Sequence, residues 1–240
     1  MRLLLPAPRD LEVEDLLDLY DSGEDRCLRA GFVVTTDGGI AFDGGSRALQ
    51  TPSDEVAFHA LRAVTDAVVV GAGTARGEGY GPVRPRPGGQ AWRARHGRSL
   101  APPLVLVSRS LELDPADRCF GGSTRAVVVT CAAAPAAARR AVAQVADVVV
   151  AGEHDVDLPA ALDALHDRGL ARLLCEGGPH LLTSLLTAGL VDELCLTLTP
   201  LLVGTAPTLL TTALPEPVRL ELRHLVDGGD GALLARYAVR

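Results

Sequence analysis

Short apolar runs rich in valine and leucine alternate with helix-like segments along most of the chain, and this alternation limits the folds open to it. We expect buried strands over residues 27–34, 66–71, 103–108, 125–130, 147–150, 171–178 and 191–200. Between them, helix-start and helix-end residues predict helices over 51–65, 135–145, 157–169 and 179–189. Strands that alternate with helices form a mainly parallel sheet covered by those helices, so the sequence predicts an α/β fold.

Three segments depart from this alternation. Residues 218–226 and 232–240 read as two strands around a Gly/Asp turn, which predicts a C-terminal antiparallel hairpin at an edge of the sheet. Residues 1–25 are expected to be a helical extension, with a helix over 10–20 capped by Asp10. Residues 77–102, rich in Gly, Pro and Arg, are expected to be a long surface loop. With no repeat and no linker, one domain over 1–240 is predicted.

Composition narrows the classes of function. Hydrophobic residues make up 48% of the 240 residues and aromatic residues only 3%, so the core must be aliphatic. A net charge of −7 argues against binding nucleic acid, although local groups could still bind a small anion. The five cysteines include no C-x-x-C pair, which argues against a disulfide framework and against a thiolate metal site. We expect no metal, no signal peptide and no membrane span, and therefore a cytoplasmic protein.

A glycine-rich loop follows the strand at 66–71. In parallel sheets ligands bind beyond the carboxyl ends of the strands, so this loop is a candidate site. The spacing of Gly71, Gly73 and Gly77 is G-x-G-x-x-x-G, which differs from the G-x-G-x-x-G of an ordinary dinucleotide fingerprint. Two readings stay open: a plain tight turn, or a helix start at which the glycines and Thr74 hold the phosphates or ribose of a cofactor.

Three other strand ends carry polar residues. Ser108 and Arg109 could bind a phosphate, or could be a solvated turn. The glycines that follow Glu176 could merely relieve crowding, or could let an anion reach the helix that starts at Pro179. The turn at Thr35 to Gly38 would face the same crevice. Together, these strand ends favour an enzyme that uses a dinucleotide.

Ordered motifs over residues 28–205 resemble the reductase domain of the bifunctional deaminase–reductase of riboflavin biosynthesis, and its stand-alone relatives. The matching motifs are Thr35-Thr36-Asp37-Gly38, Gly44-Gly45-Ser46, Leu61-Arg62, Asp66-Ala67 with Gly71 to Thr74, Glu176-Gly177-Gly178, Gly189 to Glu193, and Pro200 with Gly204. The resemblance implies a dihydrofolate-reductase-like fold, NADPH as cofactor, a phosphorylated small-molecule substrate and a homodimer. The zinc deaminase motifs H-x-E and P-C-x-x-C are absent from the sequence.

The same resemblance assigns roles by position. Asp37 or Glu176 would polarise the reacting imine. The cofactor would contact Val33, Thr35, Ala48, Gly71, Gly73, Thr74, Glu78, Ser108, Arg109, Gly177, Gly178, Pro179, His180, Leu181 and Leu182. The substrate would contact Ser46, Arg62, Pro82, Arg84 and Glu176, with the two arginines suited to its 5-phosphate.

The expected reaction is reduction by NADPH of the ribosyl group of 5-amino-6-(5-phosphoribosylamino)uracil, or a close analogue, to ribityl. The chain departs from the family pattern at Thr35, where a serine is usual, and over Gly79 to Arg84. Two alternatives stay open at this point. One is a reductase of a pterin or another heterocycle, and the other is a non-catalytic NADPH-binding regulatory dimer.

Overall fold

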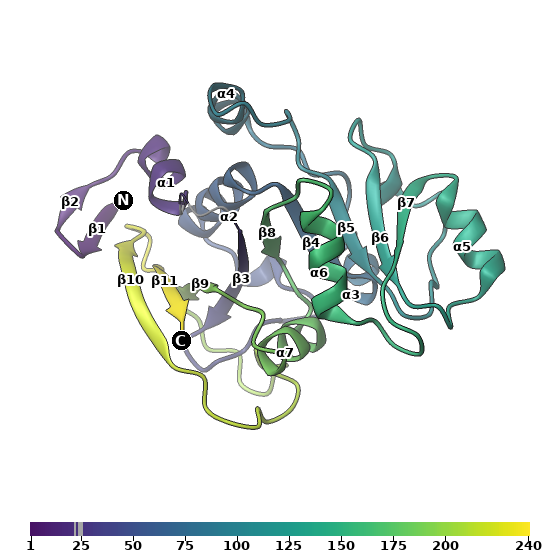
Figure 1. The fold of residues 1–240 in the computed structure, drawn as a ribbon. Coiled ribbons are helices and arrows are strands. Elements are labelled where there is room, and N and C mark those ends of the chain that lie inside the picture. The colour runs from purple at the N-terminus through teal and green to yellow at the C-terminus, as the bar shows by residue number, and fades with distance from the viewer. Residues whose placement is uncertain (22, 24–25) are drawn as a thin grey trace.

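The strands of the protein form one twisted sheet that runs through the whole molecule (Figure 1). The computed structural model describes residues 1–21, 23 and 26–240. Within these residues the sheet has eleven strands in the order β2-β1-β10-β11-β9-β3-β8-β4-β5-β6-β7. Their bounds are β1 (Arg2–Leu5), β2 (Arg9–Asp10), β3 (Cys27–Thr35), β4 (Ala67–Gly71), β5 (Leu104–Val107), β6 (Ala126–Thr130), β7 (Ala146–Val150), β8 (Arg172–Cys175), β9 (Glu193–Thr199), β10 (Leu220–Asp227) and β11 (Leu233–Val239).

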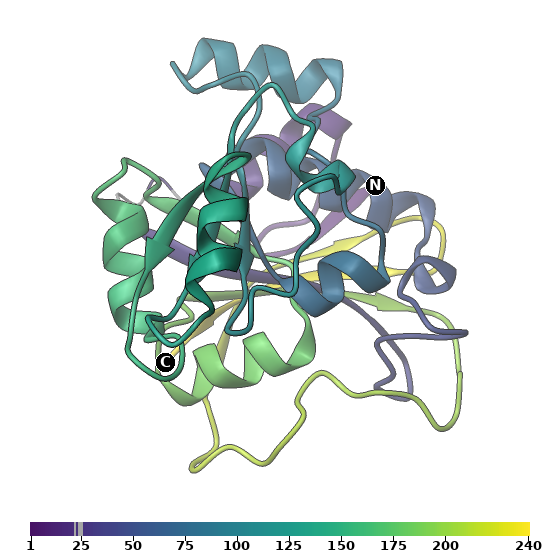
Figure 2. The same ribbon diagram turned by 90° about the vertical axis from the view of Figure 1, so that its right-hand side faces the viewer.

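Helices lie on both sides of this sheet. They are α1 (Val13–Tyr20), α2 (Pro52–Val64), α3 (Ala72–Gly77), α4 (Pro87–Arg95), α5 (Ala136–Ala143), α6 (Leu158–His166) and α7 (Pro179–Thr187). Figure 2 shows α4 on one side of the sheet and α7 on the other. The strands from β9 to β7 pair in parallel, and β9, β11, β10, β1 and β2 pair antiparallel to one another. The predicted α/β fold with a mainly parallel sheet and a C-terminal hairpin is therefore confirmed.

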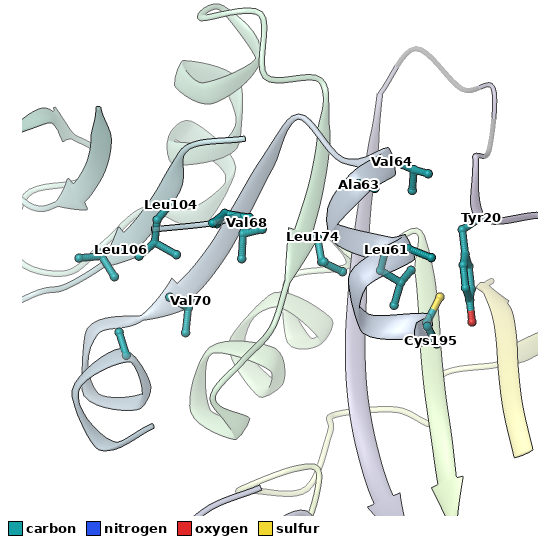
Figure 3. Close-up of a cluster of buried hydrophobic side chains, with 14 of the residues drawn as sticks. Tyr20, Leu61, Ala63, Val64, Val68, Val70, Leu104, Leu106, Leu174 and Cys195 are labelled. Carbon is teal, nitrogen blue, oxygen red and sulfur yellow. The ribbon is translucent and has the colours of Figure 1, made fainter. Parts of the chain in front are cut away.

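Alternation along the strands produces two cores. In β4, Val68 and Val70 point toward α2 and α3, while Ala67 and Val69 point toward α6 and α7. Figure 3 shows the first of these cores, with Leu174 between Val68 and Leu61 and with Tyr20 beside Cys195 at its end. The helix α2 that covers this core starts as its sequence predicts, because the Thr51 side chain accepts a hydrogen bond from the Asp54 amide.

The N-terminal segment forms the antiparallel edge of the sheet, a position that the sequence assigned to the C-terminal hairpin. Strand β1 pairs with β10, so the hairpin lies inside the sheet and β2 lies at its edge. The predicted helix over 10–20 starts only at Val13, because Glu12 and Asp15 form a reciprocal capping box and Asp10 belongs to β2. Residues 22, 24 and 25 of the predicted extension lie outside the described residues.

The segment 77–102 is not simply a surface loop, as its composition suggested. Nine of its residues form α4, which packs on α2 through the buried side chains of Trp92 and Arg93. Arg93 donates hydrogen bonds to the carbonyl oxygens of Ala63 and Thr65 at the end of α2. Gly89 lets the two helices approach, since a Cβ atom there would lie 2.9 Å from the Ala63 methyl. This packing outweighs the low helix propensity of a glycine-rich segment.

Candidate active site

A cavity of about 300 Å³ opens beyond the carboxyl ends of the central parallel strands. One face of α2 forms a wall of it, with Asp54, Ala57, Phe58 and Leu61 at helical spacing. Residues of β3 and β9, the loop before α7, the α3 segment and the segment 40–50 also line it. The cavity therefore lies where the strand-end argument placed a ligand site.

Two glycine segments that are far apart in the sequence meet at one wall of this cavity. The amide of Gly71 donates a hydrogen bond of 2.7 Å to the carbonyl oxygen of Gly177. A Cβ atom on Gly178 would lie 2.3 Å from the hydroxyl oxygen of Thr74, so only glycine leaves this approach open. Gly177 has a φ of +101° in the left-handed region, and its Cβ would meet the Phe32 ring at 3.0 Å. We call Gly71, Thr74, Gly177 and Gly178 the glycine cradle.

An ion pair fixes Glu176 beside the cradle. Arg62 donates two hydrogen bonds of 2.6 Å to the two carboxylate oxygens, and the Tyr80 hydroxyl donates a third of 2.9 Å. The guanidinium also lies 4.0 Å from the centre of the Phe58 ring. Burial alone would lower the pKa of Arg62, but the Glu176 carboxylate more than offsets this, and the pKa lies above its usual value. Burial, followed by Glu176, raises the pKa of Tyr80 well above its usual value.

The structure brings seven of the sequence-predicted residues together around the cavity: Val33, Ser46, Thr74, Glu78, Glu176, Gly178 and Pro179. Ser46 and Glu78 are joined directly, since the Ser46 amide donates a hydrogen bond of 2.8 Å to the Glu78 carboxylate. These residues come from four separate segments of the chain, so the fold alone makes them neighbours.

Asp37 and Thr35 are placed differently from the expectation. Asp37 does not line the cavity: its carboxylate accepts hydrogen bonds from the Thr35 hydroxyl at 2.5 Å and from the amides of Val203 and Gly204. The bond from Thr35, followed by that from Gly204, lowers the pKa of Asp37. The Thr35 hydroxyl is also used within this turn, where it accepts from the Gly39 amide. Through these hydrogen bonds, Asp37 connects the turn after β3 to the loop after β9.

Several expected cofactor contacts lie outside the cavity. Ser108 is buried and accepts a hydrogen bond from the Leu111 amide, while the Arg109 side chain is 69% exposed near Asp155. Leu181 and Leu182 point into the second core, so only their backbone is available to a ligand, and His180 is exposed. Ala48 is exposed in a short 3₁₀ helix over Arg47–Leu49. Gly73 has open space beside its Cα atom.

The two arginines expected to bind the substrate phosphate are not placed for it. Arg62 is already paired with Glu176. Arg84, together with Pro82, lines a different cavity of about 310 Å³ between α4 and the β5 side of the sheet. Of the residues that the structure describes, no lysine or arginine lines the cavity beside the cradle.

Sequence reasoning missed several residues of the cavity. Asp54 belongs to the predicted helix over 51–65, where it was read as helix-start chemistry, and Gln50 directly precedes that helix. Tyr20 comes from the N-terminal helix. Tyr80 lies in the segment read as a loop, although an isolated aromatic residue in a chain with only 3% aromatic residues is a usable signal. Thr197 on β9 carries a hydroxyl between the apolar residues Leu196 and Leu198.

Two features are absent from residues 1–21, 23 and 26–240. These residues contain no group of three or more His, Cys, Asp or Glu side chains that could hold a metal ion. Nor does that part of the chain contain a helix whose length and apolar character would suffice to cross a membrane.

Comparison with known proteins decides the family. A sequence model described as the RibD C-terminal domain matches residues 26–234. The chain belongs to this family. The resemblance inferred from the ordered motifs is thereby confirmed.

Relatives of this RibD C-terminal domain chain are reductases by name. A 2,5-diamino-6-ribosylamino-4(3H)-pyrimidinone 5′-phosphate reductase from Methanothermobacter thermautotrophicus is 32% identical over 213 residues, which cover 86% of this chain and 95% of the relative. A protein of the same name from Archaeoglobus fulgidus is 33% identical over 144 residues, 60% of this chain and 66% of the relative. A pyrimidine reductase-like protein from Corynebacterium diphtheriae superposes with a TM-score of 0.82 at 28% identity, covering 96% and 99% of the two chains. The expected oxidoreductase class is confirmed at the level of the family.

Proposed function

We propose that this chain is an NADPH-dependent reductase of riboflavin biosynthesis that converts the ribosyl group of a phosphorylated aminopyrimidine into a ribityl chain. Membership of the RibD C-terminal domain family and the names of the relatives support the reaction class. The observation that carries the proposal is the glycine cradle, which opens onto a cavity whose neighbouring wall holds the Glu176–Arg62 pair.

The residues present fit a dinucleotide at the α7 side of the cavity. Glycine at 178 leaves the space that a Cβ atom would fill, and Thr74 offers a hydroxyl at the same place. The first turn of α7 offers backbone N–H groups without partners inside the helix, which suits a pyrophosphate. When bound there, NADPH supplies the hydride that reduces the substrate. Arg109, exposed at the end of β5, is our candidate for the 2′-phosphate of the cofactor.

The substrate side needs little acid–base chemistry from the chain. Once the sugar ring opens to an imine, reduction adds a hydride to C1′ and a proton, taken from solvent, to the attached nitrogen. Glu176 is held in one orientation by Arg62 and Tyr80, so its carboxylate can accept hydrogen bonds from the substrate without rearranging. Positioning by such preset groups is the contribution that a protein makes to cofactor chemistry.

The direct test is oxidation of NADPH by the purified chain when the aminopyrimidine ribosyl phosphate is added. We expect loss of NADPH fluorescence that depends on the substrate, with a product heavier by two hydrogens. Oxidation with dihydrofolate instead would move the proposal to a pterin substrate. NADPH binding without turnover of either compound would favour the regulatory alternative, and no NADPH binding would overturn every cofactor assignment made above.

The proposal also covers the cellular compartment and the oligomeric state of the enzyme. We place the enzyme in the cytoplasm, because Cys119, Cys131, Cys175 and Cys195 are buried free thiols that suit a reducing compartment. We also propose a homodimer, as the family resemblance implies. Exposed leucines on β9 and β10 support this assembly, since large apolar side chains at the surface often mark an interface.

A further inference from the structure

Three carboxylates line the cavity, those of Asp54, Glu78 and Glu176, and their surroundings differ. Glu78 accepts a hydrogen bond from the Ser46 amide. Glu176 is neutralised by Arg62. Asp54 lines the same cavity and is only 6% exposed, yet it forms no ion pair with any residue that the structure describes. A buried carboxylate without a cation is costly unless other donors reach it. Asp54 is therefore a buried lining carboxylate that keeps hydrogen-bonding capacity for a ligand.

The neighbours of Asp54 add acceptors and negative charge. Burial raises the pKa of its carboxyl group, a hydrogen-bonding contribution from the Thr197 hydroxyl lowers it, and the charges of Asp230 and Glu55 raise it again. Asp230 is held nearby in the hairpin turn, where its carboxylate accepts from the amide and hydroxyl of Ser53. A carboxylate offers about four lone-pair sites, and Thr197 can fill one of them. The remaining sites can accept hydrogen bonds from the N–H or O–H donors of a ligand in the cavity.

The position of Asp54 separates it from the cofactor end. Glu176 is two residues from Gly178, so the Glu176–Arg62 pair lies beside the glycine cradle. Asp54 precedes Arg62 by eight residues on α2, which places the two about 12 Å apart along the helix axis. A substrate that reaches the cofactor with its sugar can therefore direct its ring toward Asp54.

The two candidate rings differ in what they offer to a carboxylate. The diaminopyrimidinone presents the N3–H and the 2-amino group side by side, which is a two-donor fork. The corresponding uracil carries a carbonyl oxygen at C2. This oxygen and the carboxylate oxygen that it would face are both hydrogen-bond acceptors, so they would repel each other. A carboxylate pairs best with two parallel N–H donors and disfavours an opposed acceptor.

We propose that Asp54 is a specificity-determining residue that binds the N3–H and 2-amino edge of the substrate, so that the enzyme prefers the 2-amino pyrimidinone to the uracil. This inference rests on the proposed function and names the substrate class of the same site.

The test compares kcat/KM for the two ribosylamino phosphates in the wild type and in Asp54→Asn. We expect the wild type to favour the diaminopyrimidinone by at least about 100-fold, because a site built to hydrogen-bond a group strongly rejects the analogue that lacks it. The asparagine side chain offers one acceptor and one donor, which matches the N3–H and carbonyl of uracil. Asp54→Asn should therefore lose most of its activity with the diamino compound while keeping or gaining activity with the uracil, mainly through KM.

Glu55→Gln is the matched control, because Glu55 is the next residue on α2 and its side chain is 52% exposed. It should leave the substrate preference unchanged. If Asp54→Asn lowers both activities equally, Asp54 is structural and the proposal is overturned. A wild type that prefers the uracil also overturns it, while leaving the proposed function intact. Turnover of neither compound would instead count against the proposed function itself.

A second measurement covers the case in which Asp54→Asn does not fold. The free bases 2,5,6-triaminopyrimidin-4-one and 5,6-diaminouracil can be compared as inhibitors of the wild-type enzyme. We expect tighter inhibition by the triamino base, because it keeps the two-donor edge. Equal inhibition by the two bases would contradict the proposal without any variant.

Discussion

At the scale of single residues, the glycine cradle makes the sharpest prediction. Gly178 has a φ of −71°, outside the left-handed region, and a Cβ atom there would meet the Thr74 hydroxyl oxygen at 2.3 Å. We expect Gly178→Ala to weaken NADPH binding by about 10- to 100-fold, since overpacking a tight contact costs about 1–3 kcal/mol. Fluorescence titration measures this change.

Gly73→Ala is the matched control for that variant. Its Cβ atom would meet nothing within 4 Å, so NADPH affinity should stay within about twofold of the wild type, as for surface changes within ±0.5 kcal/mol. Equal losses in the two variants would show that the α3 segment, and not the contact between Thr74 and Gly178, controls binding.

A buried histidine predicts the acid sensitivity of the fold. His224 is 2% exposed, and it packs against Tyr20 with the two ring centres 5.2 Å apart. Burial, and then the charges of Arg236 and Arg29, lower the pKa of His224 to about 4. Between about pH 6.5 and 4 the unfolded chain therefore binds a proton that the folded chain does not, and stability falls as the pH falls.

The size of this effect is about 1.4 kcal/mol for each pH unit in that window. Urea unfolding at several pH values should show this slope in the wild type and a shallower slope in His224→Gln. The slope is the quantity to compare, because a buried glutamine changes the absolute stability as well. An exposed-site variant, His180→Gln, should keep the wild-type slope, and an unchanged slope in His224→Gln would remove His224 as the cause.

At the scale of elements, the Trp92 side chain anchors the glycine-rich helix α4 to the rest of the fold. Trp92 is 1% exposed, stacks on His96 with ring centres 3.9 Å apart, and donates a hydrogen bond to Asp18 of α1. We expect Trp92→Ala to lower the free energy of unfolding by about 3–5 kcal/mol, the usual cost of removing a buried aromatic side chain. Arg95→Ala, on the exposed side of the same helix, should change it little. A small effect of Trp92→Ala would mean that α4 is not required for the stability of the fold.

The same helix shows where prediction from sequence stops. The strand at 66–71 could be predicted because its own residues form a continuous apolar run. The helix after Thr51 could be predicted because Thr51 is a good N-cap residue. Helix α4 could not, since its two glycines oppose a helix locally and contacts with α2 and α1 stabilise it. Asp54 was missed for a related reason: acids near a helix start are ordinarily favourable there, and only the fold turns this one toward a cavity.

At the scale of the whole molecule, the fold also explains which candidate residues meet. Motif order placed Glu176, Gly178 and Thr74 correctly at strand ends, because parallel strands bring their carboxyl ends to one edge. It could not place Arg62 or Arg84, since the direction of a long side chain depends on its partners. Arg62 turns to Glu176, and Arg84 turns to a different cavity.

An apolar patch on one face of the sheet predicts how two copies of the chain associate. Leu222 pairs with Tyr237, and Tyr237 with Leu194, so these three side chains lie on the same face. Leu194 lies in the core beneath α6 and α7, whereas Leu198, Leu220 and Leu222 remain 37%, 44% and 38% exposed on the same face. Leu198, Leu220 and Leu222 form an apolar patch that is continuous with the core beneath α6 and α7, but these two helices do not cover it. A second copy of the chain, placed by a twofold axis, could cover it.

We expect the wild type to be a dimer by sedimentation equilibrium, and Leu222→Glu to raise the dimer dissociation constant by at least about 30-fold, as for the loss of an interface hot spot worth about 2 kcal/mol. The charge acts by requiring a carboxylate to be buried without a partner. Leu100→Glu, at a 66% exposed leucine outside the patch, should remain dimeric. A monomeric wild type would overturn the homodimer. A Leu222→Glu variant that stays dimeric would keep the assembly but move its interface away from the β9–β10 face.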